Sequence, residues 1–348
     1  MTRFAFRMRH QEPILFGLPE PSPMNASRRH FLRQATLSGA STLMAPSLLQ
    51  AQSFGFACRA YAVADHDSGQ LLDSDHATTK LPIASLTKIA SAMVVIDWAA
   101  KFKRNLSSVV TVPPDAAKLS AFGQSILSPG DRISLRALLY AALIQSDNIA
   151  AHTLASNLGK GFPNESDPST PPEYAFVAQM NALARQLGMN STKFQNAHGI
   201  EALENHSLHS TAADLAKLSI YAMGNSEFRF YVSQPSREIS FESSAKGQKK
   251  VALQNTNTLL GVNKIDGVKT GSTLRSGGCV IISAARSPEA WTVGDEHFSR
   301  IRRLHVVVLG SDHRFDTARN LLDRGWNLYD QWAAQGRPDK NRKTSLNR

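Results

Sequence analysis

The chain has 348 residues, of which 42% are hydrophobic and 19% charged, the composition of an ordinary globular protein. Length and composition exclude a disulfide-stapled peptide, a fibrous protein and a disordered chain. The net charge is +11, but residues 1–51 hold six arginines against two glutamates, and residues 333–348 hold five basic residues against one aspartate. Because so much of the basicity is terminal, it does not predict a nucleic-acid partner.

Residues 1–51 are predicted to be a twin-arginine export signal. Arg28 and Arg29 precede Phe31-Leu32-Arg33, and a charge-free, mildly apolar stretch follows over residues 34–58. A surface helix with two adjacent arginines is the alternative interpretation. The small residues of the stretch and its lack of charge favour export.

Export determines where we expect the mature chain. Cleavage is expected after Ala51, and Met24 is an alternative start because residues 1–23 do not resemble the beginning of a signal. No later segment has the roughly 18 consecutive apolar residues of a membrane-spanning helix. The mature chain is therefore predicted to be periplasmic or in the cell envelope, without a transmembrane segment.

The predicted elements place strands at both ends of the mature chain and helices between them. In chain order they begin with a hairpin with strands at 59–63 and 71–72, followed by helices at 84–100 and 134–144, another helix that begins after a break at 145–148, and helices at 171–187 and 211–223. Strands at 239–241, 267–271, 279–284 and 304–309 and a closing helix at 314–333 complete the chain. Ser134 and Thr211 are the expected N-caps of their helices. No linker or repeat divides this part of the chain, so we expect one α+β domain in which a single antiparallel sheet packs against a helical cluster.

Cys58 and Cys279 lie in apolar, strand-like runs. An exported protein can oxidise its cysteines, so a disulfide is one interpretation. A free buried cysteine behaves as a small hydrophobic residue, and we favour two free thiols.

Ser85-Leu86-Thr87-Lys88 opens a predicted helix, which places Lys88 one turn after Ser85 on the same face. A serine hydroxyl becomes a nucleophile when a base within hydrogen-bond reach takes its proton, and a desolvated lysine is such a base. By itself the pattern is common, and a capped helix with a solvated lysine explains it as well.

Two further motifs change this interpretation. Ser146-Asp147-Asn148 interrupts two predicted helices, and Lys269-Thr270-Gly271-Ser272 lies on a predicted strand, where Gly271 leaves room for a substrate along the strand. An ordinary interhelical turn and an edge strand guarded by lysine explain each motif singly. Together, the three motifs have the order and contexts of the set found in β-lactamases and penicillin-binding proteins.

On these motifs the chain resembles the low-molecular-weight penicillin-binding proteins, which are serine-type D-alanyl-D-alanine carboxypeptidases. The likeness covers residues 57–333 and includes the intervening segments 194–199, 210–215 and 255–257. Ala213 is a departure, because many relatives carry arginine there. The resemblance implies a β-lactamase/transpeptidase-like fold with a five-stranded antiparallel sheet and a catalytic domain over residues 52–335. A second expected departure is that a polar basic tail over 336–348 stands where many relatives have a β-rich second domain and an amphipathic anchor.

The resemblance also implies roles for the motif residues. Ser85 would be the acylated nucleophile and Lys88 its general base, while Ser146 would relay the proton to the leaving amine. The backbone N–H groups of Ser85 and Ser272 would form the oxyanion hole.

The substrate-binding residues would be Asn148, Lys269, Thr270, Gly271 and Ser272. Asn148 would hold the substrate amide, Lys269 would supply positive charge, and the Thr270 hydroxyl would bind the substrate carboxylate. The implied substrates are peptidoglycan stem peptides ending in D-Ala-D-Ala, with β-lactams as covalent inhibitors. The reaction needs no metal and no organic cofactor.

Alternatives remain within and outside this class. A peptidoglycan endopeptidase uses the same catalytic set, and the sequence does not separate the two activities. A β-lactamase is less favoured. Glu165 would be the first residue of the Glu-x-x-Leu-Asn pattern that positions a deacylating water, but no Leu-Asn pair follows it. A zinc peptidase built on Glu204, His206 and His209 lacks the His-Glu-x-x-His spacing. A non-enzymatic binding module is disfavoured because no motif side chain has been lost.

Overall fold

The computed structural model describes residues 56–162, 170–201 and 208–338. All of these except Phe56 belong to one compact unit. The predicted signal over residues 1–51, the cleavage site at Ala51 and most of the basic tail lie outside the described residues.

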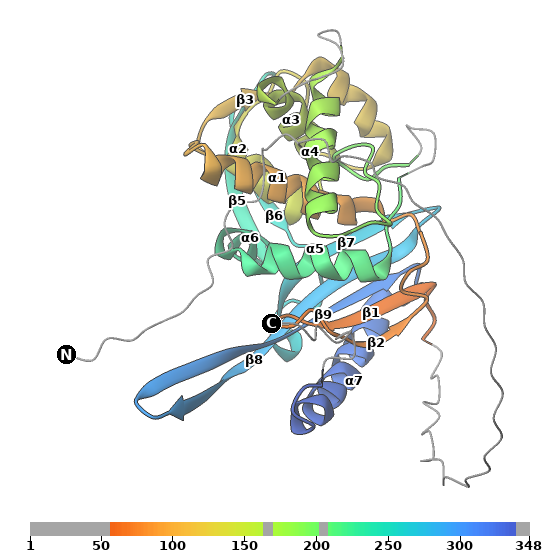
Figure 1. The fold of residues 1–348 in the computed structure, drawn as a ribbon. Helices are drawn as coiled ribbons and strands as arrows, with labels where there is room; N and C mark the ends of the chain where they lie inside the picture. The colour runs from red at the N-terminus through yellow and green to blue at the C-terminus, as the bar shows by residue number, and fades with distance from the viewer. Residues whose placement is uncertain (1–55, 163–169, 202–207, 339–348) are drawn as a thin grey trace, which may run out of the picture. The chain divides into compact units, whose positions relative to one another are not determined.

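The central sheet has five antiparallel strands in the order β2-β1-β9-β8-β7 (Figure 1). The strands are β1 (Ala60–Asp65), β2 (Leu71–Asp75), β7 (Ile265–Thr273), β8 (Gly277–Val293) and β9 (Glu296–Leu309). β1 and the adjoining parts of β8 and β9 are continuous buried runs, as expected when both faces of a sheet are covered. The prediction of a five-stranded antiparallel sheet is confirmed.

Helices α5 (Ala212–Gly224) and α7 (Arg314–Ala334) cover opposite faces of this sheet. Nδ1 of His305 lies 2.7 Å from the Ser219 hydroxyl of α5. The side chain of the preceding residue, Leu304, instead lies against α7, where a Cβ added at Gly325 would come within 3.3 Å of it. Successive side chains of a strand point to opposite faces, so the two helices enclose the sheet between them.

The helical cluster contains α1, α2, α3, α4 and α6. Their bounds are α1 (Thr87–Lys101), α2 (Leu135–Leu143), α3 (Asn148–Leu158), α4 (Pro172–Gln186) and α6 (Ser226–Val232), and the 3-10 turns of the unit are η1 (Ala84–Leu86), η2 (Pro114–Phe122), η3 (Gly159–Gly161) and η4 (Val262–Lys264). α1 is buried along most of its length. Ser134 and Thr211 cap α2 and α5 as predicted, because each hydroxyl accepts a hydrogen bond from the backbone N–H three residues later.

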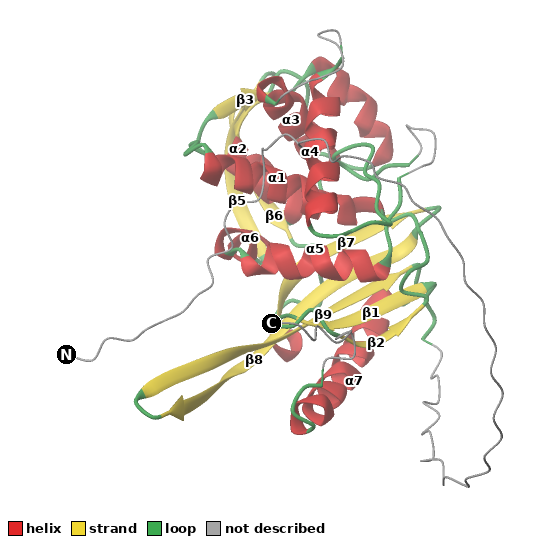
Figure 2. Cartoon of the chain, viewed as in Figure 1, coloured by secondary structure: helices red, strands yellow, loops and turns green. Residues whose placement is uncertain are grey.

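The expectation of a single sheet is wrong. A second, four-stranded sheet has the order β3-β4-β5-β6 (Figure 2). Its strands are β3 (Val109–Thr111), β4 (Arg132–Ser134), β5 (Ser236–Ser243) and β6 (Gly247–Gln254). β3 and β4 have three residues each, which is too short for a periodic signal. β6 begins with Gly-Gln-Lys-Lys, and its polar residues conceal the strand pattern.

β8 and β9 are also longer than the sequence predicts. Residues 277–284 of β8 pair with β7, and residues 304–309 of β9 pair with β1. Their remaining residues pair only with each other and form a two-stranded arm that extends beyond the sheet (Figure 2). The Trp291 and Phe298 rings stack across this arm with centroids 5.7 Å apart. Exposed charged residues interrupt its apolar pattern, which explains why periodicity did not reveal it.

Within the described ranges, no helix is long and apolar enough to cross a bilayer. Cys58 and Cys279 are both free. The prediction of free thiols is therefore confirmed.

Candidate active site

Ser85 and Lys88 lie where η1 passes into α1, as the motif predicts. The Nζ atom of Lys88 lies 2.8 Å from the Ser85 hydroxyl. Lys88 is fully buried, whereas Ser85 is only partly covered. The hydroxyl is therefore open to a ligand on one side and in contact with an amine on the other.

Lys88 has two further hydrogen-bond partners, and both are carbonyl oxygens. Its Nζ lies 2.7 Å from the backbone oxygen of His198 and 2.8 Å from Oδ1 of Asn148. The orientation of the Asn148 amide follows from its other end, because Nδ2 donates to the carbonyl of Phe122 at 3.1 Å. Neither carbonyl can donate, so each must receive an N–H of Lys88.

Burial lowers the pKa of Lys88 to about 7, while the nearby negative charge of Asp147 acts in the opposite direction. A neutral amine has two N–H groups and one lone pair. When the two N–H groups point at His198 and Asn148, the lone pair is left to face the Ser85 hydroxyl. The arrangement is therefore that of a base aimed at a serine proton.

A tight loop presents the His198 carbonyl to Lys88. Oδ1 of Asn196 accepts hydrogen bonds from the backbone N–H groups of His198 and Gly199, and its Nδ2 donates to the carbonyl of Ile200. Gly199 has φ +88°, and a Cβ there would lie 1.9 Å from the carbonyl oxygen of Ala84. The sequence shows that residues 194–199 resemble a known family. It does not predict the role of the His198 carbonyl, because a backbone group has no side-chain signature.

The Ser146-Asp147-Asn148 motif occupies the junction between α2 and α3. Asp147 is buried and holds the junction, because its carboxylate accepts from the Ser125 hydroxyl, the Ile126 N–H and the Ala150 N–H at 2.7–3.1 Å. Ser146 has φ +65° and is half-buried. Its hydroxyl has no hydrogen-bond partner within the part of the chain that the structure describes, so it is free to contact a ligand.

The Lys269-Thr270-Gly271-Ser272 motif lies on β7, directly beside η1. A Cβ added at Gly271 would lie 3.0 Å from the backbone nitrogen of Ser85. Any side chain at position 271 would therefore crowd the backbone of Ser85, and glycine permits the close approach of the strand. Ser272, the next residue, is exposed near the end of the strand.

The other two motif side chains of β7 have protein partners. Nζ of Lys269 is fully buried and donates to the carbonyl of Thr270 at 3.0 Å. Burial, followed by the charges of Lys88 and Arg314, holds the pKa of Lys269 well below its usual range. The Thr270 hydroxyl lies 2.7 Å from that of Thr256.

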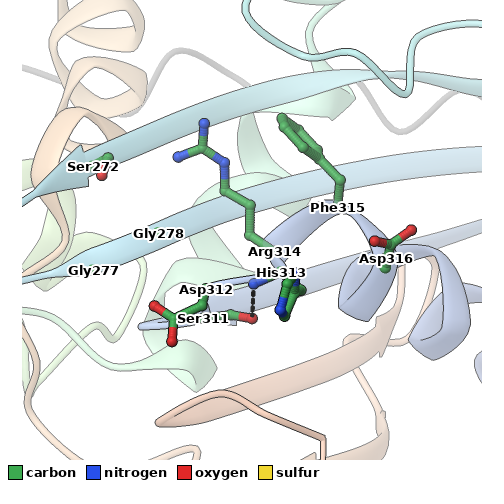
Figure 3. A pocket seen from close by; sticks show the side chains of 9 residues that line it. All are labelled: Ser272, Gly277, Gly278, Ser311, Asp312, His313, Arg314, Phe315 and Asp316. Carbon is green, nitrogen blue, oxygen red and sulfur yellow. Dashed lines mark hydrogen bonds between the residues drawn. The ribbon is translucent and has the colours of Figure 1, made fainter.

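Arg314, at the start of α7, is a candidate site residue that the sequence did not reveal. Its Nη1 donates to the carbonyl of Gly271 at 2.9 Å. It lines a cavity of about 550 Å³ together with Ser272, Gly277, Gly278, Ser311, Asp312, His313, Phe315 and Asp316. Figure 3 shows the Arg314 side chain reaching across β8 toward the strand that carries Ser272. A guanidinium has five donors, and those not used by Gly271 suit a carboxylate.

Comparison with known proteins agrees with this geometry. A family model described as D-alanyl-D-alanine carboxypeptidase matches residues 48–291. The chain belongs to the D-alanyl-D-alanine carboxypeptidase family. It is 32% identical over 282 residues to D-alanyl-D-alanine carboxypeptidase DacC of Escherichia coli, with 78% of this chain and 62% of that protein covered. The alignment thus spans less than two thirds of the DacC sequence.

The chain is also similar to proteins that are named for a different activity. The chain is 32% identical over 254 residues to the D-alanyl-D-alanine endopeptidase of Pseudomonas aeruginosa, with 70% of this chain and 74% of that protein covered. Among solved structures, it is similar to the Streptomyces K15 DD-transpeptidase, with 27% identity, a TM-score of 0.65 and coverage of 78% of this chain and 97% of that one. The predicted β-lactamase/transpeptidase fold is confirmed.

The remaining sequence hypotheses fall elsewhere in the molecule. Ala213, the departure from the family pattern, lies in the first turn of α5, where its N–H donates to the carbonyl of Ala77. It does not line the cavity that contains Arg314. Glu204 and His206 of the alternative zinc site lie outside the described residues, and His209 pairs through its backbone with Lys193.

Proposed function

We propose that the chain is a serine-type D-Ala-D-Ala carboxypeptidase that acts on peptidoglycan stem peptides through an acyl-enzyme at Ser85. The observation that carries the proposal is the contact between Ser85 and Lys88. A fully buried lysine with a pKa of about 7 has both of its neutral N–H groups engaged by carbonyls, and its third contact is the serine hydroxyl.

In this reaction the Ser85 oxygen attacks the carbonyl carbon of the penultimate D-Ala while its proton passes to Nζ of Lys88. The backbone N–H groups of Ser85 and Ser272 receive the oxyanion. When the intermediate collapses, the C–N bond breaks and the proton passes through the Ser146 hydroxyl to the leaving amine. Free D-Ala departs, and water then hydrolyses the ester and restores the Ser85 hydroxyl.

The remaining motif residues bind the substrate in this proposal. The Thr270 hydroxyl and the guanidinium of Arg314 receive the terminal carboxylate, and Lys269 adds positive potential beside it. Asn148 holds the substrate amide in addition to orienting Lys88. Gly271 keeps β7 close enough to Ser85 for the substrate to lie along the strand.

The setting of the enzyme is also a proposal. Residues 1–51 would be a twin-arginine signal, the catalytic domain would cover residues 52–335, and the basic tail would cover 336–348. The substrate supports export, because stem peptides lie in the cell envelope. β-lactams would acylate Ser85 as covalent inhibitors, since the amide of their ring presents the same carbonyl to the nucleophile.

Endopeptidase action on peptide cross-links is a second candidate. The observation that favours it is the 32% identity to the endopeptidase of Pseudomonas aeruginosa, of which the alignment covers 74%. Both activities form the same acyl-enzyme. They differ in whether the leaving amine belongs to free D-Ala or to a neighbouring stem peptide.

Mass spectrometry of two muropeptides tests both candidates. A pentapeptide monomer and a cross-linked dimer are each incubated with the enzyme and with its Ser85→Ala variant. Loss of one D-Ala from the monomer supports the carboxypeptidase, and conversion of the dimer into monomers supports the endopeptidase. If neither product forms while penicillin still acylates Ser85, both assignments are wrong.

A further inference from the structure

The described residues hold a second chemical cluster away from the Ser85 hydroxyl. Asp115 of η2, His152 of α3 and Glu173 of α4 each offer one ligand atom, and these atoms all lie within 4.8 Å of one another. His152 is only 4% exposed, and its Nε2 lies 2.9 Å from Oδ2 of Asp115. Asp115 is exposed and Glu173 is half-buried, so the cluster joins a fixed imidazole to two carboxylates that reach solvent.

We propose that Asp115, His152 and Glu173 bind a zinc ion. Imidazole nitrogen and carboxylate oxygen are ordinary zinc ligands at about 2.0–2.2 Å, which places neighbouring ligands of a tetrahedral site roughly 3.3–3.5 Å apart. The contact between Asp115 and His152 must widen slightly to reach that spacing. The longer distances between the other ligand atoms, which reach up to 4.8 Å, must shorten. Rotation of the partly exposed carboxylate side chains can shorten them. Three protein ligands leave one coordination position for water.

The contacts without metal do not account for the whole cluster. A hydrogen bond explains why Asp115 approaches His152, and the first turn of α4 favours an acidic residue such as Glu173. Neither explains why two carboxylates from different elements converge on one imidazole, because like charges repel. Lys118 lies 3.4 Å from Asp115, but this pair is half exposed on both sides and contributes little. A divalent ion supplies the missing positive charge.

The position of the cluster indicates what the ion does. Asp115 and Phe122 lie near the two ends of η2, and the carbonyl of Phe122 accepts the Nδ2 hydrogen bond of Asn148. His152 follows Asn148 by one turn on α3. An ion bound to Asp115 and His152 therefore adds a second attachment of η2 to α3, one turn after the contact of Asn148 with Phe122. Zinc binding itself does not depend on the proposed peptidase function.

Isothermal titration tests this proposal on the full chain, purified without a polyhistidine tag and freed of metal with EDTA. We expect one zinc ion per chain and a higher melting temperature with zinc, but no such response to magnesium. His152→Ala and Glu173→Gln each weaken binding by about tenfold or more, because each removes a direct ligand. His209→Ala and His313→Ala are matched controls and retain wild-type affinity.

The controls separate this site from the alternatives. Glu173→Gln changes a half-buried side chain by one atom, so the variant is expected to fold, and penicillin labelling checks that it does. The proposal is overturned if the wild-type chain binds no stoichiometric zinc. It is also overturned if Glu173→Gln and His152→Ala bind zinc as tightly as the wild type, or if His209→Ala abolishes binding.

Discussion

The pH dependence of acylation tests whether Lys88 is the base. Burial lowers the pKa of Lys88 from the ordinary 10.5 to about 7. At pH 7 about half of the Lys88 side chains are therefore neutral, whereas an ordinary lysine would be neutral in roughly one molecule in three thousand. The difference in available base is about 1,500-fold, which corresponds to ~4 kcal/mol. The acylation rate must rise with pH, because only the deprotonated amine accepts the serine proton.

The measurement is the second-order rate constant for labelling by a fluorescent penicillin between pH 5 and pH 9.5. We expect the rate to rise about tenfold per pH unit below pH 7, to reach a plateau above about pH 8, and to be roughly a hundredth of the plateau at pH 5. Lys101→Ala, at the exposed end of the same helix, should keep this profile. Lys88→Ala should lose acylation. A flat profile, or a midpoint near pH 10, would refute Lys88 as the base.

Three further predictions concern single positions. Ser85→Ala should fold and form no penicillin adduct by intact-protein mass spectrometry, whereas a labelled variant would move the nucleophile elsewhere. Gly271→Ala should slow acylation about tenfold or more, because the added Cβ would lie 3.0 Å from the Ser85 nitrogen. Gly161→Ala is the matched control and should leave the rate unchanged, because a Cβ there meets nothing within 4 Å. Asp147→Ala loses three hydrogen bonds, one of which is the N-cap of α3, so urea unfolding should show a loss of about 2–4 kcal/mol, and a loss below about 1 kcal/mol would contradict its anchoring role.

Local signals explain why much of the site was predictable. The serine and lysine of the first motif are one helical turn apart, so the helix alone brings them together. The break between α2 and α3 follows from polar residues that interrupt two apolar runs and from the cap that Asp147 provides. β7 is a largely polar strand with two glycines, and its pairing with the apolar run of β8 fixes the register of Lys269.

The parts that the sequence did not reveal depend on contacts between distant segments. The carbonyl of His198 acts through the backbone, and its position depends on how the side chain of Asn196 folds the loop. Arg314 reaches Gly271 of β7 only because α7 begins shortly after the end of β9, which is separated from β7 by β8 alone. The second sheet joins β4 to β5 through a single residue pair, Arg132 with Glu242. None of these contacts has a periodic or motif signature in the local sequence.

The burial of two lysines in one site connects the structure to turnover. Lys88 and Lys269 are both fully buried; burial lowers the pKa of Lys88 to about 7, and burial together with the charge of Lys88 holds the pKa of Lys269 well below its usual range. In the proposed reaction, Lys88 becomes cationic when it takes the Ser85 proton, in a place where desolvation already disfavours that charge. A base in this position holds the proton only briefly and returns it readily to the leaving amine through Ser146. The same burial that makes Lys88 neutral at the start therefore also drives the proton onward once the acyl-enzyme forms.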